Sequence, residues 1–184
     1  MEARQTTNLQ DEVRLLGGVL EKEELTVTNV ISYRKAAIAD KDAIWRVRSA
    51  SIRGLCKGHY GEELAERWAS VRPPADFADV ICERKFIVAE YGGVIVGFGF
   101  LADQMGTLEG LSVEPHFARR GVGTAIADLL EACARCAGVR SLTLSASLNA
   151  VPFYKTRGYR EIRETTWHHP AGFSLPCVAM TKDL

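Results

Sequence analysis

The sequence predicts an α/β (α+β) domain with a mixed, mostly antiparallel central sheet flanked by helices. Short runs of β-branched and aromatic residues alternate along the chain with helical hydrophobic patterns. The 184 residues are enough for one domain with a substantial core. We expect that domain over residues 30–184, preceded by a flexible or helical extension over residues 1–29.

The extension carries apolar residues at helical spacing, at Leu9, Val13, Leu16 and Leu20, and then breaks at two glycines. Three interpretations stay open for it: docking on the domain, a homodimer contact, or disorder, which is common in polar termini. Its first residues are acidic and polar, unlike a secretory signal.

The domain begins with an expected strand within residues 30–38. Asp40 is a suitable N-cap for a helix that continues through Leu55, and a second short helix is expected after Gly61. Pro73 and the proline after it end that helix.

Three strands follow, which we expect to form an antiparallel meander. The first two, 86–90 and 94–101, flank a Tyr-Gly-Gly sequence that is typical of a hairpin turn. The third strand is expected at 107–113. The best-defined helix of the chain follows at 121–137, with apolar residues on one face and Gly138 at its end.

The remaining elements are expected in the order strand 141–146, helix 149–157, strand 159–166 and strand 175–182. Cys133 and Cys136 look like half a zinc motif, but both are expected on the apolar side of their helix, where they serve core packing. His168 and His169 lack a third ligand at suitable spacing, so no metal site is expected.

The composition excludes some classes of partner. Lys plus Arg equals Asp plus Glu at 23 each, so no overall field attracts nucleic acid or a membrane surface. The longest apolar stretch, 94–102, is far shorter than the roughly 20 residues that span a bilayer. Five cysteines without framework spacing favour a reducing cytoplasm.

A glycine-rich loop joins the strand at 107–113 to the long helix. Gly121 and Gly123 stand at the helix start, where free backbone N–H groups and the positive end of the helix dipole bind phosphates. Arg119 and Arg120 add charge there. The spacing matches neither the P-loop nor the dinucleotide motif. A pyrophosphate site is one interpretation, and a helix-capping turn with two solvated arginines is the other.

The stretch LEGLSVEPHFARRGVGTAIADLL, followed by LTLSASLNAVPFYKTRGY, resembles the GNAT superfamily of acetyltransferases. The resemblance implies that fold from about residue 30 to 184, with acetyl-CoA as co-substrate. It further implies pantetheine contacts from the strand and pyrophosphate contacts from backbone groups of the loop. The implied cofactor-binding residues are Leu111, Ser112, Val113, Ala118, Arg119, Arg120, Gly121, Val122, Gly123 and Thr124.

The chain departs from the family at the first position of its Q/R-x-x-G-x-G/A loop, which is Ala118 when the two glycines are aligned. A register with Arg120, Gly123 and Ala125 on the motif also fits. We prefer the first register because Gly121 then opens the helix. In this register the backbone donors stay in place, but one long polar side chain near the phosphates is lost.

Two residues are candidates for proton transfer. Tyr154 lies in a segment similar to the family's F/L-Y-x-x-x-G-F/Y, which implies a general acid beside the sulfur of CoA. Its alternative role is a core tyrosine. Strand alternation places Glu109 on the face of Leu111 and Val113, where desolvation would raise its pKa toward that of a useful base. Its alternative is a strand carboxylate paired with an arginine or solvated at a barrel-like edge.

Other residues are candidates for binding. Asn149 contacts CoA or caps the following helix, and Ser147 stands where many family members carry that asparagine. His59 and Tyr60 fall in the region that covers the acceptor in the family, and both line the pocket or lie on a surface loop. Asp103 is a weaker candidate for the substrate ammonium. Trp45 and Trp68 are expected in the core or a pocket wall.

The leading hypothesis is therefore an acetyl-CoA-dependent N-acetyltransferase that acts by direct attack in a ternary complex. Its acceptor is a small-molecule amine or a peptide amine. The alternative is a catalytically silent acyl-CoA-binding module, and a third option is another nucleotide-binding domain. Acetyltransferases that act on basic peptides gain from an acidic groove, so net neutrality argues against a strongly cationic acceptor.

Overall fold

The computed structural model describes residues 30–102 and 104–184. The proposed extension at 1–29, with its homodimer interpretation, and Asp103 lie outside the described residues. The elements follow in the order β1 (Ile31–Lys35), η1 (Ile38–Asp40), α2 (Lys41–Ser51), the π-helical turn η2 (Ile52–Cys56), α3 (Lys57–Tyr60), α4 (Glu62–Ala69), α5 (Phe77–Glu83), β2 (Lys85–Tyr91), β3 (Val94–Leu101), β4 (Leu108–Val113), η3 (Pro115–Phe117), α6 (Val122–Cys136), β5 (Ser141–Ser147), α7 (Val151–Thr156), β6 (Arg160–His169) and β7 (Phe173–Asp183).

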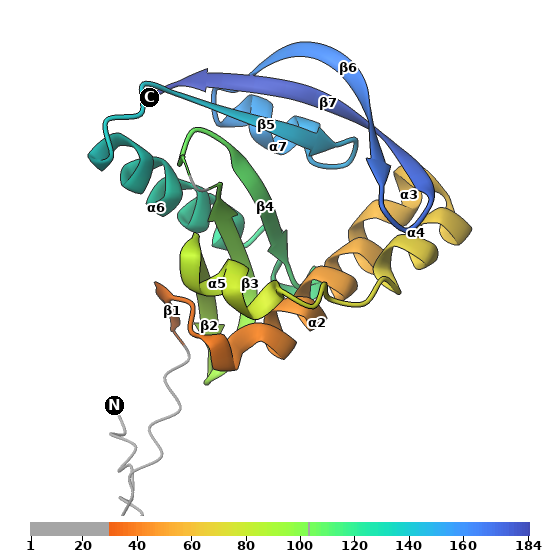
Figure 1. Cartoon of the computed structure of the whole chain (residues 1–184), viewed down its shortest axis with the longest axis horizontal. Coiled ribbons are helices and arrows are strands. Elements are labelled where there is room, and N and C mark those ends of the chain that lie inside the picture. Colours follow the sequence, from red (N-terminus) through yellow and green to blue (C-terminus); the bar gives the residue numbers. More distant parts are fainter. Residues whose placement is uncertain (1–29, 103) are drawn as a thin grey trace, which may run out of the picture.

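The strands form two antiparallel sheets, in the orders β1-β2-β3-β4 and β5-β7-β6. A parallel bridge between Thr107 and Thr143 connects them, and the Thr143 N–H donates to the Gly106 carbonyl at 3.0 Å. Beyond this point β4 and β5 separate, as Figure 1 shows. The fold class is confirmed. The expected central sheet is divided into two sheets, because β4 and β5, which run parallel, separate after the bridge.

Helix α6 packs on one face of the first sheet, and its position depends on glycines in β3. A Cβ atom at Gly97 would lie 3.0 Å from Val122, and one at Gly99 would lie 2.8 Å from Ile126. The glycines therefore let the helix approach the strand closely. The expected apolar face of α6 is confirmed by burial of Val122, Ile126 and Leu130, whereas Leu129, expected on the same face, is 39% exposed.

The two cysteines of α6 differ in their surroundings. Cys133 packs partly buried against the main core, as expected. Cys136 is exposed, so its expected place on the apolar face is wrong. It follows the buried Ala134 by two residues, which is about 200° around the helix, so it lies on the side away from the core.

The opposite face of the first sheet is covered by α2 and α5, whose core includes Ile44, Phe77, Ile81 and Phe86. Helix α5 is absent from the elements expected from sequence. Its seven residues are too few to display a clear helical period after two prolines.

The hairpin between β2 and β3 is confirmed. Tyr91 pairs with Val94, which leaves Gly92 and Gly93 as a two-residue turn with φ values of 56° and 78°. Positive φ at both positions matches the twist of the flanking strands and favours glycine.

Asp40 does not cap α2 with its side chain. Its carboxylate accepts from the Ala37 N–H at 2.7 Å and pairs with Arg34 at 2.6 Å. The helical segment starts one turn earlier than expected, at Ile38, so Asp40 lies in its first turn. There its carboxylate provides an acceptor for the Ala37 N–H, which has no partner within the helix. None of the helices in the described ranges has the length and apolarity that crossing a membrane needs.

Candidate active site

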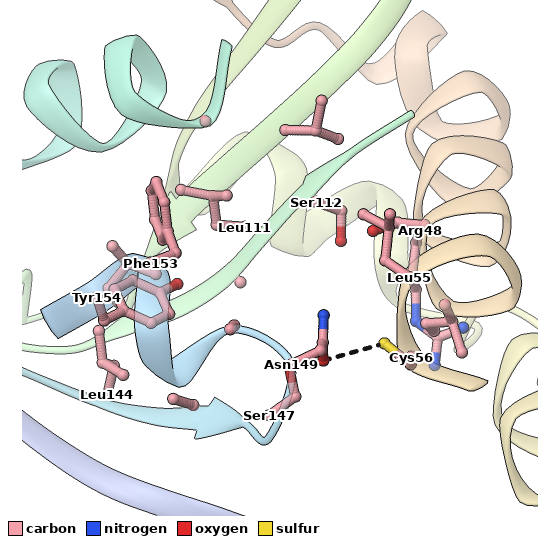
Figure 2. Close-up of a pocket in the computed structure, with 18 of the residues that line it drawn as sticks. Arg48, Leu55, Cys56, Leu111, Ser112, Leu144, Ser147, Asn149, Phe153 and Tyr154 are labelled. Atoms are coloured by element: carbon pink, nitrogen blue, oxygen red, sulfur yellow. Dashed lines mark hydrogen bonds between the residues drawn. The ribbon is translucent and has the colours of Figure 1, made fainter. Parts of the chain in front are cut away.

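A cavity of about 1040 Å³ lies where the two sheets part. Its walls come from α2, η2 and α3 on one side, and from β4, the loop before α6, β5 and α7 on the other. In Figure 2 Tyr154 and Phe153 lie at one end, Arg48, Leu55 and Cys56 lie at the other, and Ser112 and Asn149 lie between them.

The loop before α6 has the backbone of an anion site. Gly121 is left-handed, with φ of 83°, and Arg119 is left-handed too, with φ of 60°. Alternating right- and left-handed residues turn successive N–H groups toward one concavity. The first bond of α6 runs from the Ala125 N–H to the Gly121 carbonyl at 2.9 Å. The N–H groups of the first turn precede that bond, so the helix leaves them unused, and a ligand can accept hydrogen bonds from them.

Most of the expected loop residues reach the cavity. Its wall includes Ala118, Arg119, Gly121, Gly123 and Thr124. Two loop residues do not line it. The Val122 side chain is buried in the core, and the Arg120 guanidinium lies 5.5 Å from the centre of the Phe117 ring. A ligand would therefore meet these two residues through their backbone.

Strand β4 presents Leu111, Ser112 and Val113 to the cavity, as expected. Its register against β3 is irregular, because Leu101 pairs with Leu108 whereas Phe100 pairs with Gly110. Glu109 is thus the extra residue of a β-bulge. A bulge shifts the alternation of a strand and interrupts its ladder.

The bulge corrects the expected surroundings of Glu109. Leu108, rather than Glu109, joins Val113 in the main core. The Glu109 side chain is 34% exposed and forms an ion pair with Arg84, the residue that follows α5. The desolvated carboxylate expected from strict alternation is therefore wrong. Glu109 still lines the cavity, so it is accessible to a substrate there.

Tyr154 is buried in α7 and lines the cavity. Figure 2 shows its hydroxyl directed from α7 toward the middle of the pocket. Burial raises the pKa of this phenol above its ordinary value, and the nearby Arg157 opposes the shift. The hydroxyl therefore stays protonated at neutral pH, as a general acid must.

Asn149 lies in the cavity wall and does not cap α7, whose N-cap is Ala150. Its side-chain oxygen accepts a hydrogen bond from the Cys56 thiol at 3.3 Å, which Figure 2 marks. The capping role is wrong because the helix starts one residue later than that role requires. Ser147 also lines the cavity.

His59 and Tyr60 both line the cavity, at its helical side. The Tyr60 hydroxyl is used in structure, because it donates to the Pro176 carbonyl at 2.7 Å and accepts from the Leu148 N–H at 2.9 Å. Asp103 cannot be assigned a place, since it lies outside the described residues.

Arg48 is a cavity residue that sequence reasoning missed, and α2 presents it to the same space. Its neighbour Trp45 also lines the wall, as does Trp68, in agreement with the expectation for these tryptophans. Arginine is common on the exposed faces of helices, so the spacing of apolar residues in α2 gave no reason to place Arg48 on the side that faces the cavity.

The chain resembles known acetyltransferases in sequence and fold. Residues 56–182 match the family described as Acetyltransferase (GNAT) domain. The uncharacterized N-acetyltransferase YjcF of Bacillus subtilis (strain 168) is 32% identical over 124 residues, which are 66% of this chain and 86% of that protein.

Solved structures agree with this match. A GCN5-related N-acetyltransferase from Rhodopseudomonas palustris, described also as an aminotransferase of class II, is 33% identical with a TM-score of 0.78, and the match covers 83% of this chain and 95% of that one. The PaiA N-acetyltransferase of Thermoplasma acidophilum, solved in complex with coenzyme A, is 18% identical with a TM-score of 0.64 over 84% and 99% of the two chains. The second likeness concerns the fold alone.

Proposed function

Because the chain belongs to the GNAT superfamily and is an N-acetyltransferase enzyme, we propose that it transfers an acetyl group from acetyl-CoA to a primary amine by direct attack in a ternary complex. One observation carries this proposal: a single cavity is lined by the helix-start loop, by strand β4 and by Tyr154. A phosphate-binding backbone and a proton donor thus face the same space. We assign this activity to the domain at 30–184.

The loop residues from Ala118 to Thr124 would hold the pyrophosphate, mainly through backbone N–H groups. Supporting this, Gly121 carries a positive φ, and a Cβ atom added to Gly123 would lie 3.4 Å from its nearest neighbour, a side-chain atom of Leu111. A phosphate oxygen can approach such an open backbone closely. Arg119, which is exposed in the cavity wall, adds positive charge.

The edge of β4 would receive the pantetheine arm and the thioester. Beyond the Thr107–Thr143 bridge β4 and β5 form no ladder with each other in the described residues, so the β4 backbone facing β5 is open to a ligand. Leu111 and Val113 supply apolar contacts there, and Asn149 and Ser147 are further polar candidates from the opposite wall.

The chemistry needs one base and one acid. Glu109 would accept the proton of the ammonium, directly or through water, so that the neutral amine can attack the thioester carbonyl carbon. The C–N bond forms, and collapse of the tetrahedral oxyanion breaks the C–S bond. Tyr154 would donate its proton to the departing sulfur, which leaves as the free thiol. The nitrogen then loses its second proton, which returns the phenolate to a phenol, and Glu109 releases its proton to solvent.

The cytoplasm is the compartment we propose for this reaction, because all five cysteines of the chain are free thiols in the structure. Such a set is typical of a reducing environment. The acceptor is proposed to be a small-molecule or peptide amine.

The decisive experiment measures thiol release from acetyl-CoA with pooled amines. Turnover that is lost in Tyr154→Phe and Glu109→Gln supports the assigned roles. A silent acyl-CoA-binding module would instead gain thermal stability from CoA and show no turnover with any amine. Protection by ATP or NAD in place of CoA would indicate a different nucleotide-binding domain.

A further inference from the structure

Arg48 is a cation in the wall of the cavity. It is half-buried on α2, and its guanidinium lies 4.5 Å from the centre of the Trp45 ring. Two of its nitrogens donate to the Trp68 carbonyl oxygen at 3.3 and 3.4 Å, which is long for such bonds. These contacts hold the side chain in place without neutralising its charge.

No carboxylate pairs with Arg48 within residues 30–102 and 104–184. Arg157 is a useful contrast. Its side chain is 10% exposed, and it bonds to Asp128 at 2.5 Å and to Glu131 at 3.2 Å. A guanidinium withdrawn from water normally has such a partner, because burying an unpaired charge is costly. Arg48 lacks one in the described part of the chain.

Arg48 nevertheless keeps its charge. Desolvation lowers the pKa of its guanidinium to about 10, which is still well above neutral pH. The carboxylate that lines the cavity, Glu109, pairs with Arg84. Arg119 contributes a second positive charge near the helix start. Positive charge therefore prevails in the wall of the cavity.

The surroundings of Arg48 are largely aromatic. The cavity wall here contains Tyr60, Trp45, Trp68 and Trp167. The Trp68 ring makes edge contacts with two of the others, at centre-to-centre distances of 5.7 Å to Tyr60 and 6.4 Å to Trp167. Such a wall favours an apolar body beside a single anionic group.

We propose that the acceptor amine carries a carboxylate, which binds Arg48, and an apolar body, which packs on these aromatic rings. The acceptor class is thus a free amino acid with an apolar or aromatic side chain. This inference rests on the proposed function. A planar guanidinium and a carboxylate form two parallel hydrogen bonds, and the pair would supply the missing partner of Arg48. A phosphate would bring roughly two charges to this single arginine, so we favour the carboxylate.

The test compares matched amines in the thiol-release assay with acetyl-CoA. The pairs are phenylalanine with 2-phenylethylamine, tryptophan with tryptamine, and leucine with 3-methylbutylamine, and O-phosphoethanolamine tests a phosphate in place of the carboxylate. We expect the carboxylated member of at least one pair to have the higher kcat/KM, by roughly tenfold or more. Equal or better use of the decarboxylated members in every pair, or a preference for O-phosphoethanolamine, would overturn the inference.

Variants link the preference to Arg48. Arg48→Gln should lower kcat/KM for the carboxylated amine by roughly 10- to 100-fold, mainly through KM, and should leave its decarboxylated partner nearly unchanged. Arg48→Lys keeps the charge and should recover part of the loss. The matched control is Arg53→Gln, which removes an exposed arginine paired with Glu66 outside the cavity and should change neither substrate.

Acetyl-CoA binding, measured by calorimetry on each variant, reports folding and separates the two proposals. If wild type neither binds acetyl-CoA nor acetylates any amine, the proposed function fails, and this inference fails with it. If amines are acetylated but Arg48→Gln retains the full preference, only the inference fails. If acetyl-CoA binds without turnover, carboxylated amines must bind wild type more tightly than Arg48→Gln, or the inference is overturned.

Discussion

The Tyr60 hydroxyl donates a hydrogen bond to the Pro176 carbonyl oxygen at 2.7 Å, across 116 positions of the chain. It also accepts from the Leu148 N–H at 2.9 Å. One side chain of α3 thereby ties the helical wall of the cavity to β7 and to the loop after β5. The helical wall is thus joined to the second sheet by a phenol with both of its bonding roles used, in addition to the bond between Cys56 and Asn149.

Removing that hydroxyl should destabilise the fold. Tyr60→Phe removes both bonds and takes the partner from the part-buried Leu148 N–H, so we expect the free energy of unfolding to fall by about 1–3 kcal/mol. Urea denaturation followed by circular dichroism measures the change. The control is Tyr33→Phe, whose ring packs against the core and whose hydroxyl has no hydrogen bond with the described residues. A change at Tyr60 as small as that at Tyr33 would show that the two bonds contribute nothing.

Tyr154→Phe should reduce kcat by roughly 10²- to 10⁴-fold, the usual contribution of a general acid. Acetyl-CoA affinity should stay within a small factor, because the ring remains in place. Isothermal titration and steady-state kinetics measure the two quantities. The matched control is Tyr159→Phe, a buried tyrosine next to Tyr154 that does not line the cavity. Equal kcat values for wild type and Tyr154→Phe would remove Tyr154 from the mechanism.

The pH dependence of the wild-type rate provides a second test of Tyr154. Burial raises the pKa of its phenol above the ordinary value. A general acid acts only when protonated, so its contribution is present below the pKa and lost as pH rises through it. We therefore expect no alkaline loss of kcat below about pH 10 from this group. A loss centred near pH 8 that disappears in Tyr154→Phe would contradict the assignment of the acid.

Glu109→Gln should lower kcat/KM at pH 7 by roughly 10²-fold or more, if Glu109 is the base. The loss should shrink as pH rises toward the pKa of the amine, because a neutral amine needs no base. Rates at pH 7 to 10 with one amine measure this trend. The control is Glu114→Gln, which also breaks an ion pair with an arginine, at Arg46, and lies outside the cavity wall. A loss that is constant with pH would indicate a structural role through Arg84.

Glu109 also marks a limit of prediction from sequence. The ranges of β3 and α6 follow from patterns within each segment, since a buried strand or helix face appears in the sequence as a run or a regular spacing of apolar residues. The bulge at Glu109 depends on how β4 pairs with β3, where the adjacent residues Phe100 and Leu101 pair with Gly110 and Leu108 and skip the residue between them. Strict alternation cannot reveal this irregularity, so the sequence favoured a desolvated Glu109 over the alternative of a carboxylate paired with an arginine, which the structure shows.

The residues of the cavity wall were predictable to different degrees. Gly121 and Gly123 carried a local signal, because a helix start with glycines has a known use. Arg48 and the bond between Cys56 and Asn149 carried none, since their partners lie far away in the chain. Capping was the local alternative for Asn149, and it failed because α7 starts one residue later than that role requires.

Gly123→Ala should separate folding from cofactor binding. A Cβ atom there would make ordinary contacts, 3.4 Å from Leu111 and 3.6 Å from Val113, so the melting temperature should hardly change. The methyl group would occupy the space that a pyrophosphate needs, and we expect acetyl-CoA affinity to fall by roughly tenfold or more, or about 1.4 kcal/mol. The control Gly58→Ala adds a methyl group in α3, where nothing lies within 4 Å. Unchanged affinity in Gly123→Ala would move the pyrophosphate away from this backbone.

The last prediction concerns Glu131, a carboxylate of α6 that is 2% exposed. It accepts from Lys182 at 2.6 Å and from Arg157 at 3.2 Å, so it joins α6 to β7 and to the end of α7. Glu131→Gln leaves these two cations beside a neutral amide in a place that water hardly reaches. We expect a loss of about 3–5 kcal/mol of stability, the usual cost of breaking a buried ion pair from one side.

Urea denaturation of Glu131→Gln measures this loss, and Glu161→Gln is the control. Glu161 pairs with Lys155 at 2.7 Å on the surface, with side chains 44% and 56% exposed. Water and salt screen such a pair, so its removal should cost at most about 1 kcal/mol. Because Arg157 follows the helix that carries Tyr154, the Glu131 variant should also lower kcat in conditions where it remains folded. A loss of stability no larger than that of Glu161→Gln would mean that solvent, rather than Glu131, stabilises the charges of Lys182 and Arg157.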